Sequence, residues 1–236
     1  MQVNKWIFNN LSWLWSSRCL LCDSTTRPPH DWLCKSCEGD IGTDQPVCPT
    51  CAMPLTGVAD SLCGDCQNNP PAYASVYRFA PYDAPLDRLI LQFKFQQKLT
   101  IGRKLGMLMA QDIRQQRLPL PDVLVPVPLH ASRLRQRGYN QALELARPIA
   151  KLLNLSIDVE SCIREKATTD QIGLPAKLRK SNLKNAFSVN GDFRDKRVTI
   201  IDDVMTTGST VNELSQQLIN AGARQVNVWV CARAVL

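Results

Sequence analysis

The chain has 236 residues, of which 44% are hydrophobic and 21% are charged. This composition is ordinary for a soluble globular protein with one large domain, or a medium and a small one. No run of 18 or more apolar residues is present, so we expect no transmembrane helix. The net charge of +7 is uneven, since residues 1–70 have 4 basic and 7 acidic residues and residues 71–236 have 24 and 14. The basic second part favours a phosphorylated or polyanionic ligand, although solvated surfaces are often basic as well.

The N-terminal stretch MQVNKWIFNNLSWLWSSRC does not have the pattern of a signal peptide. Polar residues interrupt its apolar run, and no small-residue cleavage site follows. It predicts a short amphipathic helix with five apolar residues on or near one face: Trp6, Ile7, Leu11, Leu14 and Trp15. That face would pack on the rest of the protein, or it would contact a membrane surface or a partner. We therefore expect a cytoplasmic protein, with association at the inner face of the membrane as an open alternative.

Eight of the ten cysteines form four Cys-x-x-Cys pairs, and successive pairs are 11, 10 and 11 residues apart. Such pairs are typical of zinc knuckles, each of which offers two thiolates to a tetrahedral Cys₄ shell. The pairs are Cys19/Cys22, Cys34/Cys37, Cys48/Cys51 and Cys63/Cys66. Joining consecutive knuckles is the simplest arrangement and gives two zinc ions, although the spacing also allows a crossed arrangement.

A closed Cys₄ shell leaves no position for water, so we expect this zinc to be structural rather than catalytic. About 70 residues with so few large apolar side chains need the metal to fold. The alternative is four disulfides in a secreted protein, which the missing export signal disfavours. Cys162 and Cys231 stand alone in apolar or strand-like surroundings, and we interpret them as core residues.

The stretch QNNPPAY has the composition of a linker, so we expect a zinc-ribbon region at 1–70 and a larger domain at 71–236. The larger domain alternates strands and helices. We expect, in chain order, a strand over 74–80, a helix with Leu86, Leu89, Ile90 and Phe93 on one face, a helix over 101–116, a strand over 122–127, a helix over 140–153 kinked at Pro148, a strand over 197–202, a helix over 210–221 and a strand over 225–234. This order predicts an α/β fold with a parallel sheet, whose ligands bind at the carboxyl ends of the strands.

Two adjacent carboxylates, Asp202 and Asp203, stand at the end of the buried strand RVTIID. Adjacent acids repel each other unless a cation or hydroxyl donors lie beside them. The loop after them is rich in hydroxyl groups around one glycine: Thr206, Thr207, Gly208, Ser209 and Thr210. We expect Thr210 to be the N-cap of the next helix and Glu213 to complete a capping box. A phosphate would bind at that helix N-terminus, and Gly208 would permit the tight turn.

The acid pair and the hydroxyl loop together predict one ligand with a phosphate at one end and a diol in its middle. Ribose 5-phosphate has this chemistry. The stretch is neither a Walker loop nor a dinucleotide fingerprint, because it has no Gly-Lys-Ser/Thr and no Gly-x-Gly-x-x-Gly. An ordinary strand, turn and helix with polar turn residues is the alternative, but the acids, hydroxyls, glycine and cap all agree with the ligand.

The stretch VTIIDDVMTTGST resembles the PRPP-binding signature of type I phosphoribosyltransferases. From Cys19 onward the chain resembles the ComF family, the phosphoribosyltransferase-like competence proteins that include GntX-like DNA-utilisation proteins. Three further features support this resemblance: the four knuckles, VPVPLHASRLRQRGYNQALELA, and TTDQIGLPAKLRKSNLKNAF. The resemblance implies a type I phosphoribosyltransferase-like domain behind an N-terminal double zinc ribbon.

The resemblance also implies roles for particular residues. Asp202 and Asp203 would hold the ribose hydroxyls, and Mg²⁺ through water, while residues 206–210 would hold the 5-phosphate. The loop after VPVP would be the pyrophosphate loop, to which three arginines would offer guanidinium groups: Arg133, Arg135 and Arg137. The segment 164–187 would form a hood over the site, with three distinctive polar residues: Gln171, Arg179 and Asn182. Arg137 and Arg179 are the arginines that we assign to catalysis.

Three hypotheses about function follow. In the first, an enzyme moves a phosphoribosyl group from PRPP to a nucleobase or a related acceptor and releases pyrophosphate. In the second, a DNA-handling protein keeps the PRPP site as a ligand sensor and binds single-stranded DNA on a basic face, since residues 117–197 have 15 basic and 8 acidic residues. In the third, the zinc ribbon is a docking module for a membrane, helicase or transport partner. The resemblance favours a role in DNA uptake or in the use of DNA as a nutrient.

Overall fold

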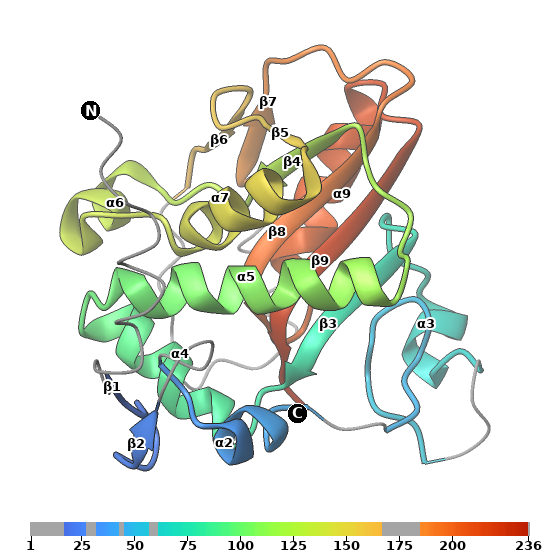
Figure 1. Ribbon diagram of the computed structural model, residues 1–236. Coiled ribbons are helices and arrows are strands. Elements are labelled where there is room, and N and C mark those ends of the chain that lie inside the picture. Colours follow the sequence, from blue (N-terminus) through green and yellow to red (C-terminus); the bar gives the residue numbers. More distant parts are fainter. Residues whose placement is uncertain (1–16, 27–31, 43–44, 57–60, 167–184, 236) are drawn as a thin grey trace.

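The computed structural model describes residues 17–26, 32–42, 45–56, 61–166 and 185–235. Within these ranges a five-stranded sheet has the order β3-β9-β8-β4-β5, and every neighbouring pair is parallel (Figure 1). The strands, in that order, are β3 (Ser75–Pro81), β9 (Gln225–Arg233), β8 (Arg197–Met205), β4 (Val123–Pro126) and β5 (Ser156–Ile157). The predicted parallel α/β fold is confirmed.

The long central strands β8 and β9 are apolar on both faces. Val198, Ile200 and Ile201 in β8 are completely buried, as are Val228 and Cys231 in β9. Strands of a parallel sheet are covered on both sides, so they appear as nearly continuous apolar runs rather than alternating ones. Cys162 is also buried, which confirms that both lone cysteines belong to the core.

Helices cover both faces of the sheet. They are α4 (Leu86–Phe95), α5 (Leu99–Gln115), α6 (Ala131–Arg137), α7 (Gln141–Leu153) and α9 (Ser209–Asn220). Helices α5 and α7 lie over one face and α9 over the other (Figure 1). The apolar positions predicted for α4 are its buried ones, because they repeat with the helical period. At Gly106 a Cβ would lie 2.5 Å from the carbonyl oxygen of Leu145, so α5 and α7 approach closely there.

The chain order creates a switch point between β4 and β8. After β4 the chain passes through α7 to the outer strand β5, whereas after β8 it passes through α9 to β9 on the other side. The two connections diverge, so this is a topological switch point at the carboxyl ends of β4 and β8. Ligands of open α/β sheets bind at such switch points, so this edge is the place to look for a site.

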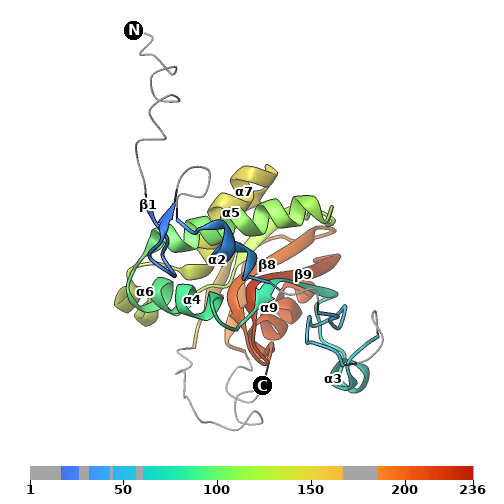
Figure 2. The same cartoon turned by 60° about the horizontal axis from the view of Figure 1, so that its bottom comes forward.

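Two cysteine-rich parts pack at separate places. The first contains β1 (Ser17–Arg18), β2 (Thr25–Thr26) and α2 (Lys35–Gly39), and the second contains α3 (Gly64–Asn68). Figures 1 and 2 show β1 and α2 near α4, and α3 apart from them. Cys19 and Leu33 share a buried cluster with the apolar residues of α4. Cys48 and Cys51 share another with α9 and the end of β8.

Several details differ from the sequence predictions. Strand β8 extends three residues beyond the predicted 197–202, so the acid pair lies within it. Helix α6 was expected as loop, and a hairpin of β6 (Cys162–Arg164) and β7 (Phe187–Val189) was not expected at all. Helix α7 runs unbroken through Pro148.

The start of α9 is a correction. The prediction that Thr210 is the N-cap and that Glu213 completes a capping box is wrong. Gly208 is the N-cap, with φ +75°, and no side chain caps the helix. The Glu213 carboxylate instead accepts a hydrogen bond from the amide of Asn185, at 2.9 Å.

The predicted N-terminal amphipathic helix and most of the predicted hood lie outside the described residues. None of the described helices has both the length and the apolar character needed to cross a bilayer.

Candidate functional site

The acid pair lies near the carboxyl end of β8, at the switch point. Asp203 is 8% exposed and Asp202 is partly exposed. The amide of Asp203 donates to Asp202 Oδ1 at 2.9 Å, and the amide of Val204 donates to Asp203 Oδ1 at 2.6 Å. These short local bonds fix both carboxylates relative to the strand.

Lys94, in the last turn of α4, pairs with Asp203. Its Nζ lies 2.9 Å from Asp203 Oδ1, and both side chains are mostly buried. Burial disfavours the ammonium, but the Asp203 carboxylate outweighs it and raises the pKa of Lys94. The sequence analysis missed this residue, because nothing local marks a lysine after the buried Phe93 as the partner of a distant acid.

The ionised form of Asp202 is disfavoured by its surroundings. Burial and the neighbouring Asp203 raise the pKa of Asp202 to about 7, and Lys94 and Arg164 oppose this only in part. Burial and the charge of Asp203 therefore both disfavour the ionised form of Asp202. A cation or hydroxyl donors beside Asp202 would favour its ionised form.

The hydroxyl-rich loop turns sharply from β8 into α9. The Thr207 and Ser209 hydroxyl oxygens are 2.9 Å apart, and the Ser209 amide donates to Thr207 Oγ1 at 3.3 Å. Gly208 has a left-handed conformation, which glycine adopts without the strain that a side chain would bring. Thr206 is exposed, while Thr210 lies in the first turn of α9. The loop thus brings three threonines and a serine to a helix N-terminus, where anions are favoured.

A pocket of about 260 Å³ lies between the end of α4 and α6. Its lining residues are Lys94, Phe95, Gln97, Arg133, Gln136 and Arg137. Burial and the adjacent Arg137 and Arg164 lower the pKa of Arg133. Positive charge is crowded in this pocket, as a polyanion such as pyrophosphate requires. Of the three arginines predicted for the pyrophosphate loop, Arg135 is exposed and does not line the pocket.

Arg164 enters the site from the β6–β7 hairpin. Its guanidinium lies over the ring of Phe187, 5.5 Å from the ring centre. Burial lowers the pKa of Arg164, and the nearby Asp202 carboxylate acts in the opposite direction. The hairpin therefore places a cation near the acid pair, at the start of the predicted hood. The other predicted hood residues, Gln171, Arg179 and Asn182, lie outside the described residues.

The eight paired cysteines form two clusters, joined in consecutive order. One contains Cys19, Cys22, Cys34 and Cys37, and the other contains Cys48, Cys51, Cys63 and Cys66. In each cluster the sulfur atoms lie within 4.8 Å of one another. The Cys22–Cys34 and Cys51–Cys63 sulfur distances are 3.7 and 3.6 Å, close to the ~3.8 Å edge of a ZnS₄ tetrahedron. The donors therefore fit two structural zinc ions.

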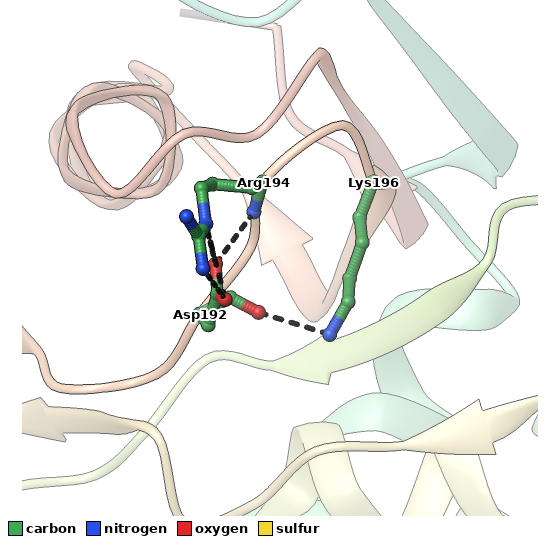
Figure 3. A network of polar contacts seen from close by, with 3 residues as sticks. All are labelled: Asp192, Arg194 and Lys196. Atoms are coloured by element: carbon green, nitrogen blue, oxygen red, sulfur yellow. Dashed lines mark hydrogen bonds and ion pairs between the residues drawn. The ribbon is translucent and has the colours of Figure 1, made fainter.

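Not all basic residues of the second half face the site. Asp192, Arg194 and Lys196 form a network at the turn before β8, at the opposite edge of the sheet (Figure 3). The Arg194 guanidinium donates to both carboxylate oxygens of Asp192, which lowers the pKa of Asp192 to about 2. Arg197 pairs with Asp122 at 3.2 Å. Arg194, Lys196 and Arg197 thus lie at the other edge of the sheet from the acid pair, unlike Arg133, Arg137 and Arg164.

Comparison with known proteins agrees with this architecture. The double zinc ribbon domain family matches residues 10–67, and the phosphoribosyl transferase domain family matches residues 139–234. DNA utilization protein YhgH of Escherichia coli (strain K12) is 38% identical over 221 residues, which cover 92% of this chain and 97% of that protein. The chain belongs to the ComF family. The resemblance indicated by the sequence motifs is confirmed, as is the zinc ribbon in front of a phosphoribosyltransferase-like fold.

Other ComF relatives align over similar lengths. Competence protein F of Haemophilus influenzae is 37% identical over 224 residues, covering 92% of this chain and 97% of that protein. Competence protein ComFC of Streptococcus pneumoniae is 23% identical over 235 residues, covering 92% of this chain and 100% of that protein.

Comparison with solved structures gives matches with low scores. The glutamine PRPP amidotransferase from B. subtilis gives a TM-score of 0.38 and 22% identity, over 55% of this chain and 25% of that chain. A purine phosphoribosyltransferase from Pyrococcus horikoshii Ot3 gives a TM-score of 0.33 and 18% identity, over 56% of this chain and 84% of that chain. At these scores the likeness carries no conclusion about ligand or reaction.

Proposed function

We propose that this ComF-family protein binds PRPP with Mg²⁺ and acts in DNA uptake or in the use of DNA as a nutrient. One juxtaposition carries the proposal: an acid pair, a hydroxyl loop at a helix N-terminus and a cationic pocket meet at one switch point. These parts match the diol, the 5-phosphate and the pyrophosphate of PRPP. The names of the relatives, DNA utilization protein and competence protein, support the biological role.

Each part of the ligand has a proposed set of residues. Asp202 and Asp203 bind the ribose hydroxyls. The loop 206–210 binds the 5-phosphate through its hydroxyls and the first amides of α9. The pyrophosphate lies in the pocket of about 260 Å³, where Lys94, Arg133 and Arg137 face it. We keep Arg179 as a proposed hood residue that closes on the pyrophosphate.

Mg²⁺ fits the charge at the acid pair. Burial and the Asp203 carboxylate raise the pKa of Asp202 to about 7, and a cation beside it would favour the ionised form. Hard cations prefer carboxylate and phosphate oxygens, and PRPP supplies the latter. When bound, Mg²⁺ would neutralise charge on the pyrophosphate and on Asp202.

Phosphoribosyl transfer is the reaction that this geometry supports. The bond between C1 and the pyrophosphate oxygen breaks, a nucleophilic nitrogen of the acceptor bonds to C1, and positive charge develops on the ribose ring. Lys94 and Arg137 stabilise the departing pyrophosphate electrostatically, while the β6–β7 hairpin and the hood exclude water. Calorimetric titration of PRPP tests binding, and pyrophosphate release in the presence of nucleobases tests turnover.

PRPP binding is expected to strengthen as pH rises. The Asp202 carboxyl, with a pKa of about 7, is mostly protonated below that pH. Ligand and Mg²⁺ favour the ionised form, so binding releases a proton, and the Kd should fall by about tenfold between pH 6 and 8 and then level off. Calorimetry in two buffers of different ionisation enthalpy measures the released proton. Protons can come from the Asp202 carboxyl or from PRPP itself, and Asp202→Asn should remove only the first contribution. If wild type and variant release the same number of protons, the proton does not come from Asp202.

Single-stranded DNA binding is a second candidate, favoured by Phe95. This side chain is 68% exposed at the end of α4, and the Arg137 guanidinium lies 5.7 Å from its ring centre. Exposed aromatic rings beside arginines are the elements on which unpaired bases stack. Phe95 also lines the cationic pocket, whose basic side chains would bind the phosphates of the DNA backbone.

If DNA binds there, Phe95→Ala should weaken binding of a labelled oligo(dT) by about tenfold in fluorescence anisotropy, since a stacked base contributes ~1–3 kcal/mol. Binding should weaken with added salt and persist in Asp202→Asn/Asp203→Asn. Leu91→Ala, another exposed apolar position on α4, is the matched control. Equal binding by wild type and Phe95→Ala would remove this candidate.

A further inference from the structure

Arg233, at the end of β9, is a buried cation whose hydrogen-bond partners among the described residues are carbonyl oxygens. It is 3% exposed. Its Nη1 donates to the carbonyl oxygens of Met205 at 3.1 Å and Ala234 at 2.7 Å, and also to that of Thr206. Within the part of the chain that the structure describes, Arg233 forms no ion pair with a carboxylate. Burying a guanidinium is costly unless it is hydrogen-bonded, and these carbonyl oxygens accept from it.

The same side chain reaches the second zinc cluster. Arg233 Nε donates to the carbonyl oxygen of Cys51 at 3.0 Å. One guanidinium therefore joins the backbone of a zinc knuckle to the two residues at which β8 turns into the hydroxyl loop. No other residue in the described ranges has hydrogen bonds to both of these segments.

Further contacts connect the same two regions. The amide of Ala72 donates to Asn212 Oδ1 at 2.7 Å, which ties the segment after the second cluster to the first turn of α9. Tyr73 is buried, and its hydroxyl would lie 3.2 Å from a Cβ at Gly208. Cys48 and Cys51 share a buried cluster with Met205. The second cysteine cluster and the segment that follows it thus pack against the hydroxyl loop.

We propose that Arg233 is a positioning residue that couples the second zinc centre to phosphate binding. It holds the carbonyls of Met205 and Thr206 against the Cys51 backbone, which fixes the loop in the conformation that receives a 5-phosphate. The inference rests on the proposed function, because the loop must bind phosphate. If Arg233 has this role, zinc in the second centre raises the affinity for the ligand.

Separate titrations of ribose 5-phosphate and pyrophosphate into the full chain test this coupling. Arg233→Met should weaken ribose 5-phosphate by about tenfold, because charge-assisted bonds that order its loop are lost. Pyrophosphate binding should be unchanged, since its pocket lies on α4 and α6. Arg233→Lys should recover part of the affinity, and Arg224→Met, an exposed arginine at the other edge of the sheet, should have no effect. A general loss of structure would weaken both ligands, and equal weakening would therefore overturn the coupling.

Hydrogen exchange separates this inference from the proposed function. In Arg233→Met, and in Cys63→Ser with the second zinc lost, the amides of residues 205–210 should exchange faster than in wild type. Unchanged exchange in both variants overturns the coupling. If wild type binds neither ligand, the proposed function fails, and faster exchange would still support the link between the zinc ribbon and the loop.

Discussion

Replacing both Asp202 and Asp203 with asparagine is expected to weaken PRPP binding in the presence of Mg²⁺ by at least about tenfold, or ~1.4 kcal/mol. The two carboxylates are the only acids that the structure describes at the carboxyl end of β8, where hydroxyl and metal ligands converge. Asparagine keeps the shape of the side chain but removes the negative charge that, under the proposed function, would bind Mg²⁺ and accept hydrogen bonds from the ribose hydroxyls. Isothermal titration calorimetry measures the difference.

The control for this experiment is a double variant at the opposite edge of the sheet. Asp192→Asn/Asp195→Asn removes the same charge from exposed positions near Arg194 and should bind PRPP like wild type. The circular dichroism of each variant must match that of wild type. If folded, zinc-loaded wild type does not bind PRPP, the motif serves another ligand or the structure itself. The enzyme hypothesis would then be abandoned, and single-stranded DNA would be tested next.

Removal of zinc is expected to have the largest effect on stability. Purified protein should contain two zinc ions per chain, and a strong chelator should unfold both ribbons, since structural zinc contributes on the order of 10 kcal/mol to such folds. The loss should spread to the sheet, because Cys48, Cys51 and Cys66 are buried in one cluster with residues of β8 and α9. We expect the melting temperature to fall by roughly 10 °C or more. Elemental analysis and thermal unfolding, with and without chelator, measure both quantities.

Cys162→Ala is the matched control for the zinc experiment. This cysteine is buried in the core and lies in neither cluster, so the variant should keep two zinc ions. A folded protein that contains no zinc, or that is unfolded by reductant instead of chelator, would contradict the metal sites.

Features that depend on local chemistry could be predicted from the sequence. The zinc clusters follow from the spacing of the knuckles, and α4 follows from apolar residues at the helical period. Helix α6 could not be predicted, because none of its seven residues is buried and it therefore has no periodic apolar face. The start of α9 was misplaced since Gly208 adopts a left-handed conformation, which replaces the expected cap at Thr210.

Only the part of the candidate site whose residues are contiguous in the sequence could be predicted. Asp202, Asp203 and the hydroxyl loop are contiguous in the sequence, so their joint chemistry is visible there. Lys94 and Arg233 act through tertiary contacts with segments far along the chain, and no local pattern marks them. The sheet order places these groups together, and that order is not readable from the sequence.

The position of β9 affects how the sheet can form while the chain is being synthesised on the ribosome. This strand is made after the other four strands of the sheet, yet it lies between β3 and β8. Until residue 233 has emerged from the exit tunnel, the nascent chain has β3 without a neighbour and β8 with one open edge. Unpaired strand edges invite association with other chains, and pairing between segments so distant in sequence is slow. The zinc knuckles emerge before any strand of this sheet, so they can bind metal before β9 takes its place between β3 and β8.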